Sequence, residues 1–118
     1  MINKKLQDAI NAQINAELWS AYLYLSMATN FHEMGLGGIA NWFEVQFKEE
    51  QDHAMIFYNY LVSRGGRVEL KAIDAVKTKW ESPLEAFEDT LQHEQKVTSL
   101  INDINALAVE LKDYATQN

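Results

Sequence analysis

The sequence predicts an all-α fold, a bundle of long helices, and two observations support that class. Long stretches free of Gly and Pro carry apolar residues at the helical spacing of three and four positions. The single Pro and the five Gly stand near the ends of those stretches, with the glycines gathered at 35–38 and 65–66. We therefore expect three long helices in one domain that spans residues 1–118.

A first helix is expected over about residues 4–32, where the chain contains neither Gly nor Pro. The glycines at 35–38 should end it with a short turn, so that the next helix runs antiparallel. One face of the first helix carries a mostly apolar stripe made of Leu6, Ile10, Gln13, Glu17, Ala21, Tyr24, Ala28 and Phe31. This stripe should face the core, with the carboxylate of Glu17 at its centre.

A second helix is expected from about Ile39 to Arg64, where Gly65-Gly66 should cap its carboxyl end. Its apolar stripe consists of Ile39, Phe43, Gln46, Glu50, Ala54, Phe57 and Leu61. Glu50 lies in the middle of this stripe and His53 lies on its flank. A second carboxylate is therefore expected in the core, at mid-height of the helix pair.

The segment between Gly66 and Glu81 has no helical period and is expected to be a long crossover. Fully extended it reaches ~50 Å, enough to run back along the whole second helix. The third helix should therefore lie parallel to the second. The fold class is thus an up-down helix pair followed by a long crossover.

The third helix has a clear predicted start, with Ser82 as N-cap, Pro83 at the first position and Glu85 completing a capping box. Its predicted stripe consists of Leu84, Phe87, Leu91, Glu94, Thr98, Ile101, Asn105 and Ala108. After Leu111 only residues 112–118 follow, less than two helical turns. We therefore expect a fourth helix that is truncated.

Composition and charge exclude several function classes. A net charge of −7 and a pI of 4.8 oppose nucleic-acid binding and favour cations as partners. The absence of cysteine excludes disulfides and thiolate metal sites, and it suits a reducing compartment. The amino terminus lacks a signal-peptide core and no apolar run is long enough to span a membrane. We expect a cytoplasmic protein.

The three glutamates in apolar stripes predict a metal site. A buried carboxylate is costly unless protons or cations compensate it. Glu50 and His53 are three positions apart on one helix, so both can bind the same ion. We expect Glu17, Glu50, His53 and Glu94 to form a two-metal centre, with Glu50 bridging the ions, Glu17 and His53 on one of them and Glu94 on the other. An isolated Glu-x-x-His more often lies on a solvated surface, so the prediction depends on the glutamates of the other helices.

The donor set of oxygen atoms and one imidazole suits iron better than zinc, and it leaves manganese open. Tyr24 either donates a hydrogen bond to a ligand carboxylate or is an ordinary core tyrosine. Glu49 lies beside the stripe and is either a solvated residue or part of a supplementary ion site. His32 and His93 are expected on the surface.

Three stretches of the sequence resemble a known family: Asn15-Ala16-Glu17-Leu18, Ala21-Tyr22-Leu23-Tyr24-Leu25 and Phe47-Lys48-Glu49-Glu50-Gln51-Asp52-His53-Ala54. Over all 118 residues the chain resembles the bacterial non-haem ferritins, which have a ferritin-like helical bundle. The resemblance implies ferroxidase activity at a di-iron site formed by Glu17, Glu50, His53 and Glu94. It also places Tyr24 beside that centre and Glu49 in a third iron site.

The same resemblance implies iron(II) as substrate, dioxygen or hydrogen peroxide as oxidant, and a homo-oligomeric shell that stores the ferric mineral. No haem is expected, because Gln51 and Asp52 offer no thioether ligand. Family members continue through a complete fourth helix. Two alternatives remain, a non-catalytic helical assembly module and a rubrerythrin-like di-iron peroxidase.

Overall fold

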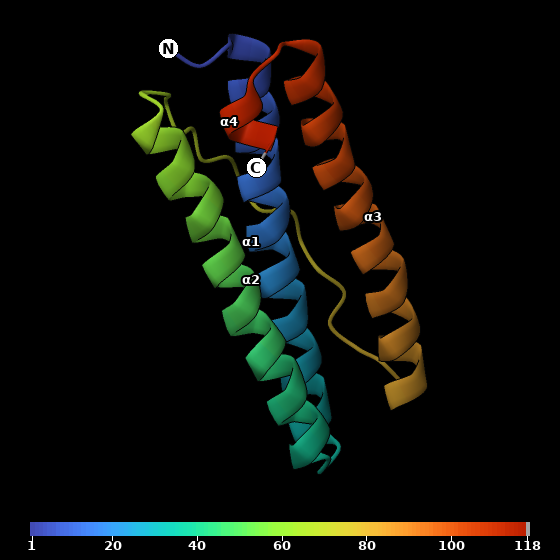
Figure 1. The fold of residues 1–118 in the computed structure, drawn as a ribbon. Coiled ribbons are helices and arrows are strands. Elements are labelled where there is room, and N and C mark those ends of the chain that lie inside the picture. Colours follow the sequence, from blue (N-terminus) through green and yellow to red (C-terminus); the bar gives the residue numbers. More distant parts are fainter. Residues whose placement is uncertain (118) are drawn as a thin grey trace.

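The computed structural model describes residues 1–117, which form three long helices and one short one (Figure 1). They are α1 (Lys4–Glu33), α2 (Gly37–Ser63), α3 (Pro83–Glu110) and α4 (Tyr114–Gln117). The helices lie along one axis and give dimensions of 50 × 21 × 21 Å. The prediction of an all-α bundle with three long helices is confirmed. None of the described helices is both long enough and apolar enough to cross a membrane.

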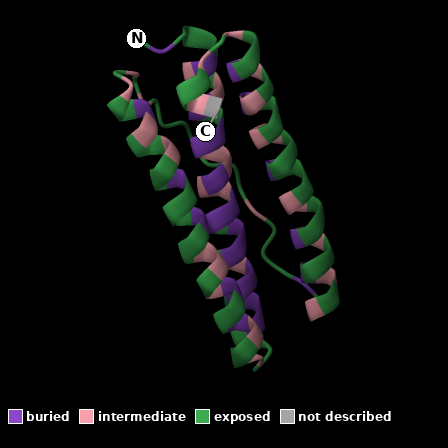
Figure 2. Ribbon diagram, in the orientation of Figure 1, coloured by how far each residue is buried: buried purple, intermediate pink, exposed green. Residues whose placement is uncertain are grey.

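Helix α1 is the most deeply buried element and packs against both α2 and α3 (Figure 2). Every residue of its predicted stripe is buried, from Leu6 to Phe31. At its carboxyl end Gly35 adopts a φ of +74°, and the Leu36 N–H donates to the Phe31 carbonyl at 2.8 Å. This left-handed turn reverses the chain, as the glycine cluster predicted.

Helix α2 begins at Gly37, two residues before the predicted start at Ile39. The Leu36 carbonyl already accepts a bond from the Ala40 N–H at 3.0 Å, so the helix includes Gly37 and Gly38, two glycines that the sequence predicts in the turn. The predicted end is confirmed by Gly65, whose φ is +73°, and by the bond from the Gly66 N–H to the Leu61 carbonyl at 2.9 Å.

The crossover runs beside α1 and is held by two buried asparagines of that helix (Figure 1). Asn11 donates to the Arg67 carbonyl and accepts from the Glu69 N–H, both at 2.9 Å. Asn30 donates to the Trp80 carbonyl at 3.0 Å and accepts from the Trp80 N–H at 3.1 Å. The crossover has no helix or sheet in which its backbone groups could pair, so each asparagine side chain supplies hydrogen-bond partners for two of them.

The substitution Asn30→Ala is expected to lower the free energy of unfolding by ~2–3 kcal/mol, because it leaves two buried backbone groups of Trp80 unpaired. Urea unfolding of the variant and the parent measures this difference. Asn59→Ala, at an exposed position of α2, is the matched control and should change the free energy of unfolding by less than ~0.5 kcal/mol. Equal effects of the two substitutions would show that the Asn30 bonds do not stabilise the fold.

Helix α3 starts at Pro83 as predicted, and the Ser82 hydroxyl accepts from the Glu85 N–H at 3.2 Å, whereas the Glu85 carboxylate accepts from the Glu81 N–H at 3.1 Å and does not complete the predicted capping box. The predicted stripe is wrong except for Ala108, its one buried member. Leu84 is 67% exposed and Leu91 is 62% exposed. The residues of α3 that are buried are Ala86, Thr90, Val97, Ile104 and Ala108. Helix α3 packs on α1 through this second face, and the predicted stripe lies beside it.

An apolar groove of about 340 Å³ lies near the ends of the helices and is lined by residues of α1, α2, α3 and α4. Ile10, Phe57 and Ile101 contribute to its walls. The turn before α4 is fixed by Asp113, whose two carboxylate oxygens accept from the Arg64 guanidinium at 2.7 and 2.9 Å. Arg64 in turn holds the pKa of Asp113 below its usual range.

Candidate metal centre

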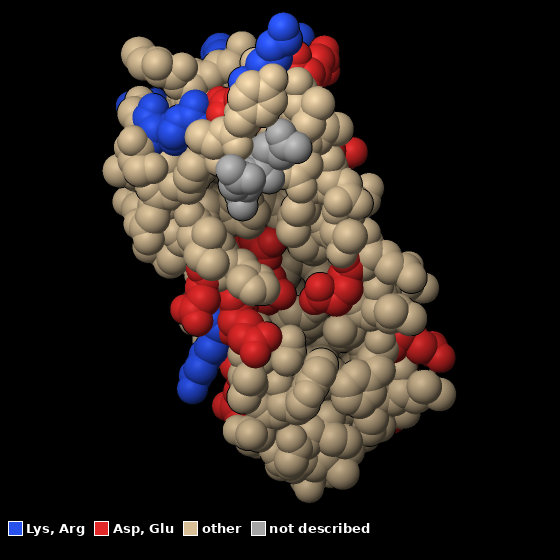
Figure 3. All heavy atoms as spheres, viewed as in Figure 1, with Lys and Arg blue, Asp and Glu red and all other residues tan. Residues whose placement is uncertain are grey.

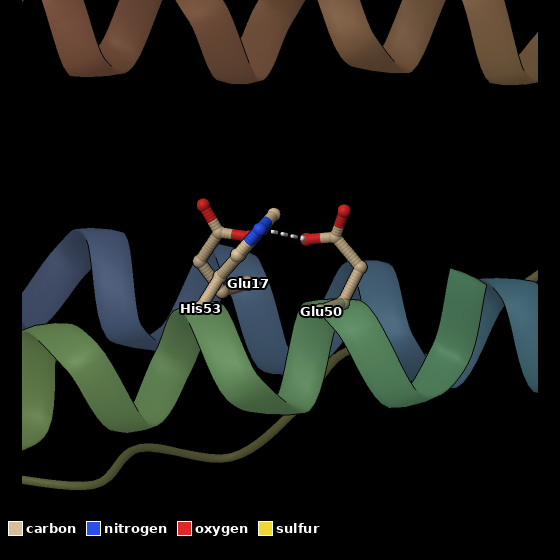
Figure 4. A group of neighbouring side chains, drawn as sticks. All are labelled: Glu17, Glu50 and His53. Carbon is tan, nitrogen blue, oxygen red and sulfur yellow. Dashed lines mark ion pairs between the residues drawn. The ribbon is translucent and has the colours of Figure 1, made fainter. Parts of the chain in front are cut away.

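Glu17 of α1 meets Glu50 and His53 of α2 at mid-height of the helix pair (Figure 4). One ligand atom from each of the three residues lies within 4.8 Å of the others. The Nδ1 atom of His53 is 3.8 Å from Oε2 of Glu17 and 3.7 Å from Oε2 of Glu50. The three side chains point toward the space between their helices and α3 (Figure 4). The structure therefore brings together three of the four ligands that the sequence predicted.

The positions of these residues follow from helix periodicity. Glu17 and Glu50 occupy central positions in the buried stripes of α1 and α2, and their exposed fractions are 1% and 4%. His53 follows Glu50 by three positions, so its ring stands one turn along the same helix face. Its side chain is half exposed, which leaves one side of the group accessible from solvent.

Burial raises the pKa of Glu50 to about 9. A hydrogen bond with Glu17, which only a protonated carboxyl can make, and repulsion from Glu17, Glu94 and Glu49 act in the same direction. When both carboxylates are ionised, Glu17 Oε2 and Glu50 Oε2 have no donor among the described residues. A cation bound between these oxygens and the imidazole would satisfy both, and the donor set fits a divalent transition metal.

Glu94 comes from α3 and lies outside the group of three in the described part of the chain. It is half-buried and accepts a hydrogen bond from the Tyr24 hydroxyl. Burial, followed by the bond to Glu94 and the nearby carboxylates, raises the pKa of Tyr24 well above its ordinary value. Tyr24 is therefore a permanent donor that fixes the Glu94 carboxylate.

Glu49 is exposed on α2 and is not a member of the group of three. The face shown in Figure 3 carries Asp and Glu side chains gathered around a hollow at mid-height. This concentration of negative charge agrees with the net charge of −7 and attracts cations toward that face.

His93 was predicted on the surface, and this prediction is wrong. Its ring is half-buried between α1 and α3, hydrogen-bonded to the Ser20 hydroxyl and 5.1 Å from the ring of Trp19. Burial lowers the pKa of His93. A usable signal existed in the spacing of Ala86, Thr90, His93 and Val97, which follows a second helical stripe of smaller side chains. His32 is exposed as predicted and pairs with Glu44 at 3.3 Å.

Comparisons with known proteins agree with this geometry. A family profile described as the ferritin-like domain matches residues 7–118. A bacterial non-heme ferritin of Bacteroides fragilis is 45% identical over 118 residues, covering 100% of this chain and 74% of the relative. A bacterial non-heme ferritin of Staphylococcus aureus is 40% identical over 116 residues, covering 98% of this chain and 70% of the relative.

Solved structures give the same result. An open pore ferritin from the hyperthermophilic archaeon Archaeoglobus fulgidus superposes with a TM-score of 0.98 at 47% identity, covering 100% of this chain and 73% of that chain. A humanized archaeal ferritin gives a TM-score of 0.98, also at 47% identity, covering 100% and 72%. The parallel arrangement of α2 and α3 across a long crossover is therefore shared with these solved structures.

Proposed function

The chain belongs to the ferritin family, and on that premise we propose that this iron-storage subunit oxidises iron(II) at the centre formed by Glu17, Glu50, His53 and Glu94. The observation that carries the proposal is the pair of buried carboxylate oxygens, Glu17 Oε2 and Glu50 Oε2, which face one imidazole and have no donor among the described residues. Such a pair is unfavourable in a core unless a proton or a cation compensates it.

The residues have distinct proposed roles toward iron(II) as substrate. Glu17 and His53 bind one ion, Glu50 lies between two ions, and Glu94 binds the second ion. Tyr24 orients Glu94 through its hydroxyl. Oxidation of each iron(II) releases one electron, and we propose dioxygen or hydrogen peroxide as the acceptor.

Glu49, exposed one residue before Glu50, is proposed as part of a supplementary iron site. We also propose that the chain acts in the cytoplasm as part of a homo-oligomeric shell. The support for the shell is the match to proteins named as ferritins, and the support for the compartment is the absence of cysteine from the sequence.

The proposal is tested by adding iron(II) without oxygen, then admitting oxygen and following the ferric absorbance. The parent should oxidise iron(II) at least ~10-fold faster than His53→Ala, because loss of the imidazole removes a ligand and leaves both buried carboxylates in place. His32→Ala is the matched control, since it removes an exposed histidine of α1 that lies outside the centre. A parent no faster than buffer alone would favour the non-catalytic assembly module.

A further inference from the structure

Gln13 is a fully buried amide one helical turn before Glu17, and none of the roles above uses it. Its side chain is 1% exposed, in the middle of the α1 stripe. The Nε2 atom of Gln13 donates to Oε1 of Glu17 at 2.8 Å. The residue therefore contacts a proposed ligand directly while lying outside the group that would bind the ion.

The orientation of the Gln13 amide is fixed by chemistry. The NH₂ end of the amide faces Glu17 and donates to its carboxylate, and the carbonyl oxygen turns away. That carbonyl oxygen, Gln13 Oε1, is buried and has no donor among the described residues. Because Gln13 Oε1 accepts no hydrogen bond from the described residues, the bond from Nε2 to Glu17 is the interaction that holds this amide in place.

The bond from Gln13 gives the two carboxylate oxygens of Glu17 different surroundings. Oε1 is occupied by the Gln13 N–H, and Oε2 is left free at 3.8 Å from Nδ1 of His53. A carboxylate without such a partner can rotate and offer both oxygens to an ion, which suits large ions with many ligands. A carboxylate with one oxygen engaged offers a single donor, which suits the smaller transition-metal ions.

We propose that Gln13 is a positioning residue that makes Glu17 a one-oxygen ligand by engaging Oε1. This inference rests on the proposed function and deepens it, because it assigns the geometry and strength of metal binding to a side chain that does not touch the ion. Partners of metal ligands act in this way when they fix the ligand's orientation.

Anaerobic titration with cobalt(II), followed by visible absorption, tests the proposal without relying on iron oxidation. Gln13→Met keeps the length and apolar volume of the side chain and removes the donor. It should lower the affinity for cobalt(II) by about 10–100-fold. It should also change the intensity of the cobalt bands, because Glu17 is then free to offer two oxygens. Gln13→Asn, which keeps the amide and is too short to reach Glu17, should weaken binding in the same direction.

Asn11→Leu is the matched control, since it removes another buried amide of α1 that bonds the crossover and does not bond Glu17. It should leave the affinity and the spectrum as in the parent, even where it lowers stability. In a Glu17→Gln background, Gln13→Met should cause no further loss. Parent-like affinity and spectrum in both Gln13 variants would overturn the role of Gln13, whereas a parent that binds no cobalt(II) would overturn the proposed function together with it.

Discussion

Replacing Glu50 by Gln is expected to weaken binding of divalent cations by more than ~100-fold while making the metal-free chain more stable. Loss of a residue that hydrogen-bonds to a metal ligand typically lowers metal affinity ~10–100-fold. Glu50 is itself a proposed ligand to both ions, so its loss should cost more. The gain in stability has a separate cause. The substitution removes a carboxyl whose pKa is raised to about 9 by burial and by the neighbouring carboxylates.

Two measurements check this prediction, cobalt(II) titration for affinity and urea unfolding in chelator for stability. Glu88→Gln provides the control, because it removes the same charge from an exposed position of α3. The control should bind cobalt(II) as the parent does. If Glu50→Gln retained the parent's affinity, Glu50 would not be a ligand.

The stability of the metal-free chain is expected to fall as pH rises from 7 to about 8.5. In this range the folded state keeps a proton on Glu50, because the pKa is about 9, whereas the unfolded chain has released it near the ordinary value of 4.5. The folded state therefore binds more protons than the unfolded state, and the free energy of unfolding decreases with pH. The slope for one such group is at most ~1.4 kcal/mol per pH unit.

The pH range of the measurement matters because His93 changes the stability with pH in the opposite direction to Glu50 at lower pH. Burial lowers the pKa of His93, so below about pH 7 the unfolded chain binds more protons at this histidine than the folded chain does. The His93 contribution to stability therefore rises with pH and offsets the falling contribution of Glu50. Above pH 7 only Glu50, of these two groups, contributes to the change of the free energy of unfolding with pH. Urea unfolding in chelator at several pH values from 7 to 8.5 gives the slope, which should disappear in Glu50→Gln. A slope of zero or a positive slope in the parent would contradict a raised pKa. The affinity of the chain for divalent cations should rise between pH 7 and 8.5, since the bound ion displaces the proton of Glu50.

The sequence predicted α1 and α2 well because each of them has one strong apolar stripe. Those stripes placed Glu17 and Glu50 in the core, and the structure agrees. Helix α3 was harder, since it carries two overlapping stripes. Its pattern predicts burial of the stripe with large side chains, such as Leu84 and Leu91, whereas the stripe with Ala86 and Thr90 is the one that packs on α1.

The same ambiguity explains why the burial of His93 could not be predicted from the sequence. The buried stripe of α3 contains the small side chains of Ala86, Thr90 and Ala108, and periodicity gives more weight to large apolar residues. His93 belongs to the stripe of small residues and was therefore assigned to the surface. Gln13 was recognised as part of the α1 stripe, but a pattern of positions cannot show which oxygen of Glu17 its amide contacts.

The two asparagine contacts of the crossover also determine how its length can vary. Asn11 and Asn30 are roughly 28 Å apart along α1 at ~1.5 Å per residue. The chain from Arg67 to Trp80, which they hold at its two ends, could extend to ~45 Å. The crossover thus contains excess length between its fixed ends, so insertion or deletion of a residue before Lys77, whose carbonyl accepts from the Ser26 hydroxyl of α1, should change only its local path. The height of Glu94 along the bundle is therefore determined by where Asn30 holds Trp80, just before α3 begins, and not by the number of residues in the crossover.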